Sequence, residues 1–254
     1  MRLVDGAEAI RGDLPTAATV TVDVPLGAGI HNGTAVHRLS SLHSVRDAQL
    51  VALGATTGLA ITIGGDCGVG LASIQHAAAA NDAMAVIWLD AHPDLNTPQS
   101  SPSGAFHGMV LRTLLGDGDA SLVPDVPLRP TMIILAGTRA LDDAELDYAE
   151  SASLRMIPPA ELDGASIAAA IAASGATSVY LHVDLDVLDP AEFDGIGYPE
   201  PFGVPLARLI EVIAAAKAAL PIVGASVTEF APSSREAAAD DLGSILRIIG
   251  ALSR

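Results

Sequence analysis

The sequence is poor in basic residues, in aromatic residues and in cysteine. Its 254 residues include 13 Lys and Arg against 30 Asp and Glu, which gives a formal net charge of −17, and aromatic residues make up only 3%. Proteins that bind nucleic acids normally present a basic face, so this class of partner is excluded. The single cysteine, Cys67, excludes an intramolecular disulfide. The excess of acidic residues favours solubility, and several Asp residues fall where a cation would neutralise them.

Long apolar runs are also missing. No segment reaches the roughly 18 uninterrupted apolar residues that a membrane span requires. The N-terminal residues Met1–Glu8 carry an acidic pair where a signal peptide would need an apolar stretch. No repeat, linker or break in composition divides the chain, and its length suits one α/β domain. We therefore expect a single domain over residues 1–254, cytoplasmic, with no membrane partner.

Apolar segments rich in Val, Ile and Leu alternate with Ala-rich segments along the chain. Strands are predicted at Thr19–Val24, Leu59–Ile63, Ala85–Leu89, Met132–Leu135, Leu154–Ile157, Ser178–Val183 and Ile222–Val227. Helices are predicted at Ser44–Thr56, Val69–Ala80, Gly108–Leu115, Asp143–Ser151, Ser166–Ala173, Leu206–Ala219 and Arg235–Leu252. This alternation predicts a parallel sheet with helices on both faces, in which ligands bind at the carboxyl ends of the strands.

Polar residues are concentrated where four of the predicted strands end, and two of these ends carry paired acidic motifs. One strand runs into Asp90, His92 and Asp94, and another into Asp184 and Asp186. Alternate residues of an extended chain point to one side, so the two segments on adjacent strands would gather four carboxylates and an imidazole. Such a cluster is repulsive without cations, and mixed oxygen and nitrogen ligands suit Mn²⁺ and similar metals. Either motif alone could instead be a polar loop or turn.

Three motifs together resemble the metal-binding signatures of the arginase/agmatinase ureohydrolase family. They are Gly64-Gly65-Asp66, Asp90-Ala91-His92-Pro93-Asp94 and Asp184-Leu185-Asp186-Val187-Leu188-Asp189-Pro190. The resemblance runs from about Gly58 to the C-terminus, whereas the first fifty residues match poorly. It implies a three-layer α/β/α fold with a mostly parallel sheet of about eight strands. It also implies a hydrolase in which a hydroxide bridging two Mn²⁺ ions attacks a guanidino carbon and releases urea.

The resemblance further implies which side chains bind the metal ions. The implied ligands are Cys67, Asp90, His92, Asp94, Asp184 and Asp186. Asp90 and Asp184 would bridge the two ions. The family has His where this chain has Cys67, and a thiolate is a softer ligand that favours zinc or iron. Three outcomes stay open: Cys67 binds a metal directly, its site is weak or empty, or the metal is a different one.

The same resemblance implies catalytic roles for His107, Glu229 and Asp94. His107 would shuttle a proton to the leaving amine, because a histidine pKa lies near neutrality. Glu229 would accept hydrogen bonds from the planar guanidinium. The implied substrate-binding residues are Asn96 and Ser103 for an α-carboxylate, Asp142 and Glu145 for an α-amino group, and Tyr198 beside the guanidinium pocket.

L-arginine or a related guanidino amino acid is the leading substrate, and the resemblance suggests a homotrimer or homohexamer. Other readings stay open: an agmatinase or another guanidino or formimino hydrolase, or a degenerate relative that binds a ligand or partner without turnover. A mononuclear deacetylase on a related fold fits the two Asp-rich motifs less well. His182 lies on the same side of its strand as Asp184 and is expected to be buried and hydrogen-bonded, without a catalytic part.

Overall fold

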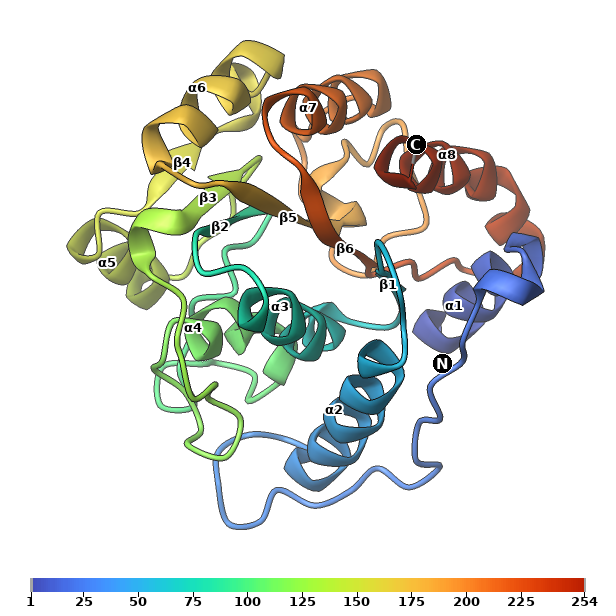
Figure 1. Ribbon diagram of the computed structural model, residues 1–254. Helices are drawn as coiled ribbons and strands as arrows, with labels where there is room; N and C mark the ends of the chain where they lie inside the picture. Colours follow the sequence, from blue (N-terminus) through green and yellow to red (C-terminus); the bar gives the residue numbers. More distant parts are fainter. Residues whose placement is uncertain (1, 254) are drawn as a thin grey trace.

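A parallel β-sheet forms the centre of the protein. The computed structural model describes residues 2–253, and within them the sheet has six strands in the order β1-β6-β5-β2-β3-β4 (Figure 1). All neighbouring strands pair in parallel. The strands are β1 (Ile61–Ile63), β2 (Met84–Leu89), β3 (Ile133–Ala136), β4 (Arg155–Ile157), β5 (Ser178–Asp184) and β6 (Ile222–Thr228).

Helices cover both faces of the sheet. One face carries α6 (Gly164–Ser174), α7 (Leu206–Ala219) and α8 (Arg235–Ser253), with α1 (Arg2–Asp13) packed beside α8 (Figure 1). The other face carries α2 (Leu39–Gly54), α3 (Gly70–Ala79), α4 (Val110–Leu114) and α5 (Asp143–Ser151). The predicted three-layer α/β/α architecture is therefore confirmed. Among residues 2–253, no helix has the length and apolar character needed to cross a lipid bilayer.

Two features of the N-terminal region differ from the prediction. Thr19–Val24 alternates Thr and Val as a strand would, but it joins no sheet, and Val20 and Val24 are 70% and 67% exposed. The sheet consequently has six strands in the described residues, rather than about eight. Helix α1 was not predicted, because its few apolar residues give only a weak pattern. Its Gly6 permits close packing, since an added Cβ would lie 2.0 Å from the Phe230 carbonyl oxygen.

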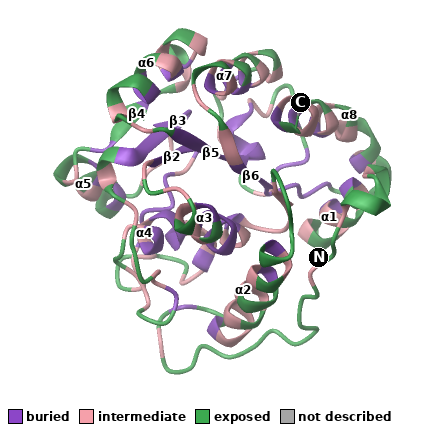
Figure 2. Ribbon diagram, viewed as in Figure 1, coloured by how far each residue is buried: buried purple, intermediate pink, exposed green. Residues whose placement is uncertain are grey.

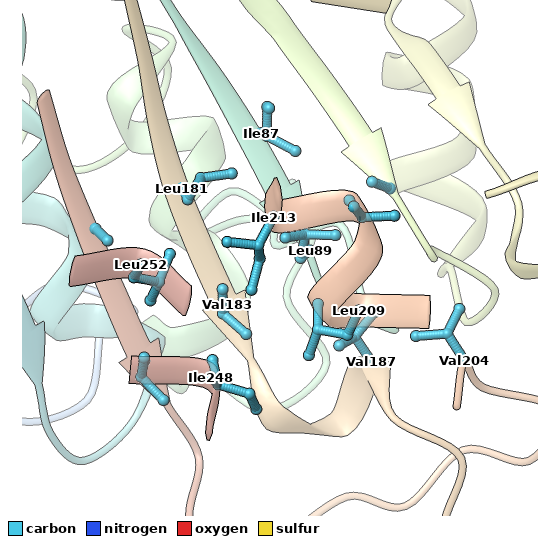
Figure 3. Close-up of a cluster of buried hydrophobic side chains, with 14 of the residues drawn as sticks. Ile87, Leu89, Leu181, Val183, Val187, Val204, Leu209, Ile213, Ile248 and Leu252 are labelled. Atoms are coloured by element: carbon cyan, nitrogen blue, oxygen red, sulfur yellow. The ribbon is translucent and has the colours of Figure 1, made fainter. Parts of the chain in front are cut away.

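The apolar core occupies both sides of the sheet. Every residue of β2 and β5 is buried, and Figure 2 shows the strands as the buried centre of the molecule. Figure 3 shows one side, where α7 and α8 bring Ile213 and Leu252 against Leu181 and Val183 of β5. Each fully buried aliphatic side chain contributes about 1.5–3 kcal/mol. The packing therefore fixes the strands, and with them the positions of the loops at their carboxyl ends.

The order in which strands are added to the sheet reverses between the neighbouring strands β2 and β5. From β2 the sheet continues through β3 to β4, and from β5 it continues through β6 to β1 on the other side. Loops leaving the carboxyl ends of β2 and β5 therefore separate to opposite sides and leave a crevice between them, where ligands bind in sheets of this kind. Asp90 follows β2 directly and Asp184 ends β5.

Candidate metal centre and active site

One pocket at the carboxyl ends of the strands gathers every site residue that the sequence indicated. Its volume is about 140 Å³. The predicted residues that line it are Cys67, Asp90, His92, Asp94, Asn96, Ser103, His107, Asp142, Glu145, Asp184, Asp186, Tyr198 and Glu229. Ser101, Pro102 and Gly108 also line it and were not predicted, because none of them has a side chain that indicates metal or substrate chemistry.

An outer group of possible metal ligands consists of Asp90, His92 and Asp186. Their ligand atoms all lie within 4.8 Å of one another. His92 Nδ1 lies 2.9 Å from Asp186 Oδ2, and the His92 side chain is 32% exposed. Two backbone amides hold the carboxylates: His92 N donates to Asp90 Oδ1 at 2.6 Å, and Ala91 N donates to Asp186 Oδ1 at 2.9 Å. The group is thus preorganised and open to the pocket.

An inner group consists of Cys67, Asp90 and His182, whose ligand atoms also lie within 4.8 Å of one another. Cys67 and His182 are 1% and 0% exposed. The Cys67 thiol donates to Asp184 Oδ2 at 2.8 Å, and His182 Nε2 lies 3.3 Å from the sulfur. His182 is buried and hydrogen-bonded as expected, but its contact with Cys67 was not predicted. Strand alternation predicted on which side of the sheet the His182 side chain lies. Only the tertiary structure shows that it faces Cys67 there.

Two carboxylates of the pocket are held in unusual backbone conformations. Asp94 and Glu229 have φ angles of 51° and 65°, in the left-handed region that non-glycine residues rarely adopt. Such positions cost on the order of 1–3 kcal/mol each and are concentrated at functional sites. Each residue also has a buried oxygen, Asp94 Oδ2 and Glu229 Oε1, that makes no hydrogen bond within the described residues. Asp94 and Glu229 therefore present two unsatisfied acceptor oxygens to the same pocket, in backbone conformations that lower the stability of the fold.

Neither Lys nor Arg is among the described residues that line the pocket, so histidine is the only type of basic side chain there that can offset its carboxylates. Burial, reinforced by Asp186, raises the pKa of Asp90 to about 7. Burial and the nearby Asp66 raise the pKa of Glu229 to about 8. Burial also raises the pKa of Asp184 well above its ordinary value. Without metal, these three carboxyl groups therefore keep their protons to a higher pH than exposed carboxyl groups do.

His92 and Asp186 form an exception, because they neutralise each other. Burial opposes charge on His92, but its hydrogen bond to Asp186 prevails and raises the pKa of His92 to about 11. Burial likewise opposes charge on Asp186, yet the same hydrogen bond lowers the pKa of Asp186. In the inner group, burial and the neighbouring Asp184 raise the pKa of the Cys67 thiol, and burial lowers the pKa of His182 to about 3.

A divalent-metal centre fits these residues. The two groups offer carboxylate, imidazole and thiol ligands and share Asp90, so that one carboxylate belongs to both. Asp184 joins the inner side through its contact with Cys67, and its Oδ1 accepts from the Asp186 amide at 2.8 Å. The unsatisfied Asp94 oxygen supplies a further acceptor. Cations would replace the protons that now balance this charge.

His107 and Tyr198 lie beside Glu229 in the pocket. His107 Nδ1 is 3.8 Å from Glu229 Oε1, and the His107 side chain is 27% exposed. The Tyr198 ring stacks on His107 with ring centroids 5.3 Å apart. Burial lowers the pKa of His107. Because it contacts both solvent and Glu229, His107 can exchange protons between the pocket and water.

The residues predicted to bind an amino acid lie together, and some are already occupied by contacts within the protein. Asn96 Nδ2 donates to Asp142 Oδ2 at 2.9 Å. Glu145 accepts from the amides of Asp142 and Leu95, each at 2.9 Å, and so closes the N-terminal capping box of α5. Both Glu145 oxygens are thus used within the protein, which makes Glu145 a support for Asp142. Ser103 accepts from the Ala105 amide at 3.1 Å and lines the pocket.

Comparison with known proteins identifies relatives of the whole fold. The family model described as "Arginase family" matches residues 12–246. An arginase of Bacillus subtilis (strain 168) is 34% identical over 153 residues, which cover 57% of this chain and 52% of the relative. The N(omega)-hydroxy-L-arginine amidinohydrolase of Streptomyces lavendulae is 31% identical over 195 residues, which cover 75% of this chain and 68% of the relative. The chain thus spans about half the length of the first of these curated relatives.

Solved structures share the architecture. The crystal structure of Entamoeba histolytica arginase in complex with L-ornithine superposes with a TM-score of 0.87 at 24% identity, over 98% of this chain and 92% of that one. An arginase structure from Bacillus cereus gives a TM-score of 0.78 at 26% identity, over 87% and 80%. The family match extends over most of the sequence and agrees with the motifs and the fold, and on this evidence the chain belongs to the arginase family.

Proposed function

We propose that this protein hydrolyses a guanidino group and releases urea, with L-arginine or a related guanidino amino acid as the substrate. One observation carries the proposal: the unsatisfied Glu229 oxygen lies in the same pocket as the whole outer group and as Cys67 of the inner group. A cation receptor therefore stands beside a centre able to activate water.

The proposed metal-binding residues are the outer group together with Cys67, Asp94 and Asp184. Two bound Mn²⁺ or similar divalent ions would lower the pKa of a water molecule and so supply a nucleophile near neutral pH. Asp90 and Asp186 would hold the ions with carboxylates that the amides of His92 and Ala91 already fix in place. Such hydrogen bonds to ligands set the geometry of a metal centre.

Glu229 binds the guanidinium. Its carboxylate is 4% exposed and has one oxygen without a hydrogen-bond donor. A planar cation with several N–H groups satisfies that oxygen and stabilises the ionised carboxylate against burial. Neither Lys nor Arg lines the described pocket, so no internal cation competes for the position.

His107 moves the proton that the leaving amine requires. The reaction breaks one C–N bond of the guanidino group, and the departing nitrogen must be protonated as the bond breaks. His107 lies 3.8 Å from Glu229 Oε1, beside the expected position of the guanidinium, and its partial exposure lets it recover a proton from water. Histidine suits this task because its pKa can be placed near neutrality.

Asp142, Asn96 and Ser103 of the pocket would recognise the amino-acid part of the substrate. Asp142 is held by Asn96 and by the bond from its own backbone amide to Glu145, and its carboxylate would accept hydrogen bonds from an α-amino group. Ser103 and Asn96 line the same pocket and would contact the α-carboxylate. The relatives named as arginase and as N(omega)-hydroxy-L-arginine amidinohydrolase agree with a guanidino amino acid as the substrate.

Urea release tests the proposal. The protein is loaded with Mn²⁺, its metal content is determined, and urea is measured with L-arginine, Nω-hydroxy-L-arginine, agmatine, guanidinobutyrate and guanidine. We expect the highest kcat/KM with one of the two guanidino amino acids. A Glu229→Gln variant is the matched control, and it should keep its metal but lose on the order of 10²-fold in kcat/KM. Absence of urea from all five compounds at full metal occupancy would overturn the proposal.

A further inference from the structure

The inner group contains a pair of side chains whose contact the proposed reaction does not require. Cys67 follows β1 and His182 lies within β5, and the two meet at 3.3 Å between Sγ and Nε2. Taking the proposed metal centre as its basis, we infer that Cys67 and His182 bind one ion together, through a thiolate and an imidazole, and that this position selects zinc.

The separation of the two atoms suits a shared ion. Bond lengths of about 2.3 Å to sulfur and about 2.0 Å to nitrogen place the two ligand atoms of a tetrahedral zinc site roughly 3.5 Å apart. The observed separation of 3.3 Å is close to this value. A carboxylate oxygen of Asp90 completes a set of three within 4.8 Å, and Asp184 Oδ2 lies 2.8 Å from the sulfur. The inner group can therefore supply three ligands to one ion, and Asp184 lies beside the sulfur.

The hydrogen bond on the far side of the ring prepares His182 for this role. Nδ1 lies 2.7 Å from Ser226 Oγ, and with the proton on Nδ1 the lone pair of Nε2 points toward Cys67. A metal-binding histidine usually donates its second ring N–H to such a partner, which fixes both tautomer and ring orientation.

The ring cannot turn away from Cys67. Trp88, His182 and Ser226 are register partners on the adjacent strands β2, β5 and β6. The Trp88 ring stacks on His182 with centroids 3.7 Å apart. On the side of α3, Gly70 leaves the space that the ring occupies, since an added Cβ would lie 3.2 Å from His182 Nδ1. Three elements therefore hold the imidazole in a position where, among residues 2–253, the sulfur is the hydrogen-bond partner of Nε2.

A second observation points to a ligand at this place. Asp94 Oδ2 is buried in the same pocket and has no hydrogen-bond partner, and Asp94 also acts electrostatically on the Cys67 thiol. Packing of an apolar thiol explains neither this oxygen nor the carboxylates around the sulfur. A cation bound there would satisfy the oxygen, and the thiol would give up the proton that it now donates to Asp184. Thiolate and imidazole ligands favour zinc over manganese.

Spectroscopy on the unaltered protein tests the inference directly. The metal-free protein is loaded with one equivalent of Zn²⁺, and zinc-edge X-ray absorption should show one sulfur neighbour together with nitrogen or oxygen neighbours. Co²⁺ in place of Zn²⁺ should give a thiolate-to-cobalt absorption band and the intense visible bands of a tetrahedral ion. Competition should show Zn²⁺ bound at least 10²-fold more tightly than Mn²⁺. A zinc shell without sulfur would overturn the inference.

Variants separate the histidine from the cysteine. His182→Gln should keep the thiolate band, lower the tetrahedral intensity and weaken Zn²⁺ binding by roughly 10–100-fold. Cys67→Ser should abolish the thiolate band. Unchanged cobalt spectra and Zn²⁺ affinity in His182→Gln would show that His182 is not a ligand. If His182→Gln does not fold, the double variant Cys67→His, His182→Ser serves instead, and it should shift the preference from Zn²⁺ toward Mn²⁺.

The inference and the proposed function can fail separately. Urea release with two Mn²⁺ ions bound and no sulfur in the zinc shell would reject the inference and leave the function intact. A zinc–thiolate shell in a protein that cleaves no guanidino compound with any metal would support the inference and reject the function.

Discussion

The inner and outer groups share Asp90 but balance their charge in different ways. In the outer group, His92 is partly exposed and forms an ion pair with Asp186. In the inner group, Cys67 and His182 are completely enclosed, and the sulfur keeps its proton and donates it to Asp184. The difference comes from solvent and from hydrogen-bond partners: His92 is partly hydrated and bonded to a carboxylate, whereas the buried His182 meets a hydroxyl and a thiol.

This contrast predicts how the two positions accept metal ions. At the outer position an ion replaces the proton of His92, and at the inner position it replaces the proton of Cys67. Both positions should therefore bind metal more tightly as the pH rises. The two differ in ligand softness, since only the inner position offers sulfur.

The largest effect is expected from Asp90→Asn, because Asp90 belongs to both groups. We expect both ions to be lost and urea release to fall on the order of 10³-fold. Metal analysis and steady-state kinetics measure the two effects. Asp82→Asn, at an exposed turn before β2, is the matched control and should change neither. Two retained ions in the Asp90 variant would contradict the assignment of Asp90 to both groups.

A smaller effect is expected from Asp186→Asn, which removes a carboxylate from the outer group alone. One ion should be lost and kcat/KM should fall on the order of 10²-fold, because the nucleophile loses one of its two cations. The thiolate-to-cobalt band of the inner position should persist. Disappearance of that band would show that the two groups form a single cooperative site.

The pH dependence of the metal-free protein tests the balance of protons. The pKa of Asp90 rises from 3.8 to about 7 and that of Glu229 from 4.5 to about 8. Their neutral forms stabilise the fold fully below about pH 4, and this stability is lost as the pH rises through 7 and 8. Burial lowers the pKa of His107, so His107 contributes stability that increases with pH. It therefore offsets part of the loss caused by the two carboxyl groups.

We therefore expect the metal-free protein to melt on the order of 5 °C lower at pH 8.5 than at pH 5.5. The metal-loaded protein should not show this loss, because the ions neutralise the carboxylates. Differential scanning calorimetry at the two pH values, with and without metal, makes the measurement. A higher melting temperature at pH 8.5 without metal would show that protons do not balance the pocket.

The smallest effect is expected from Arg139→Lys. Arg139 Nη2 donates to the carbonyl oxygens of Asp186 and Glu200, each at 2.8 Å, and Nε donates to that of Pro201 at 3.0 Å. A lysine ammonium cannot donate to all these carbonyl oxygens as the planar guanidinium does. We therefore expect the free energy of unfolding to fall by about 1–3 kcal/mol. Metal affinity at the outer group should fall roughly tenfold. An equal loss at the inner position would mean that Arg139 supports the whole pocket.

Much of the fold and of the site followed from local pattern. Uniformly apolar segments such as Ala85–Leu89 identified the strands of the sheet, and six of the seven predicted strands are present. Thr19–Val24 has the alternation of a strand but no neighbouring strand to pair with. Helix α1 has a weak pattern, and its place depends on the distant Phe230. The hydrophobic pattern of a segment shows which of its side chains can be buried. It does not show against which other part of the protein they will pack.

The sequence by itself determined the residue types and spacings that carry the chemistry: Asp90, His92 and Asp94 after one strand, and Asp184 and Asp186 at the end of another. Backbone geometry is local, so such spacing already places alternate side chains on one side of a strand. Only the tertiary structure decided that Cys67 faces His182, which lies 115 residues away. That contact requires β1 beside β6 and β6 beside β5, in a fixed register. Strand order and register depend on how two apolar faces pack against helices from the whole chain, and no segment carries that information alone.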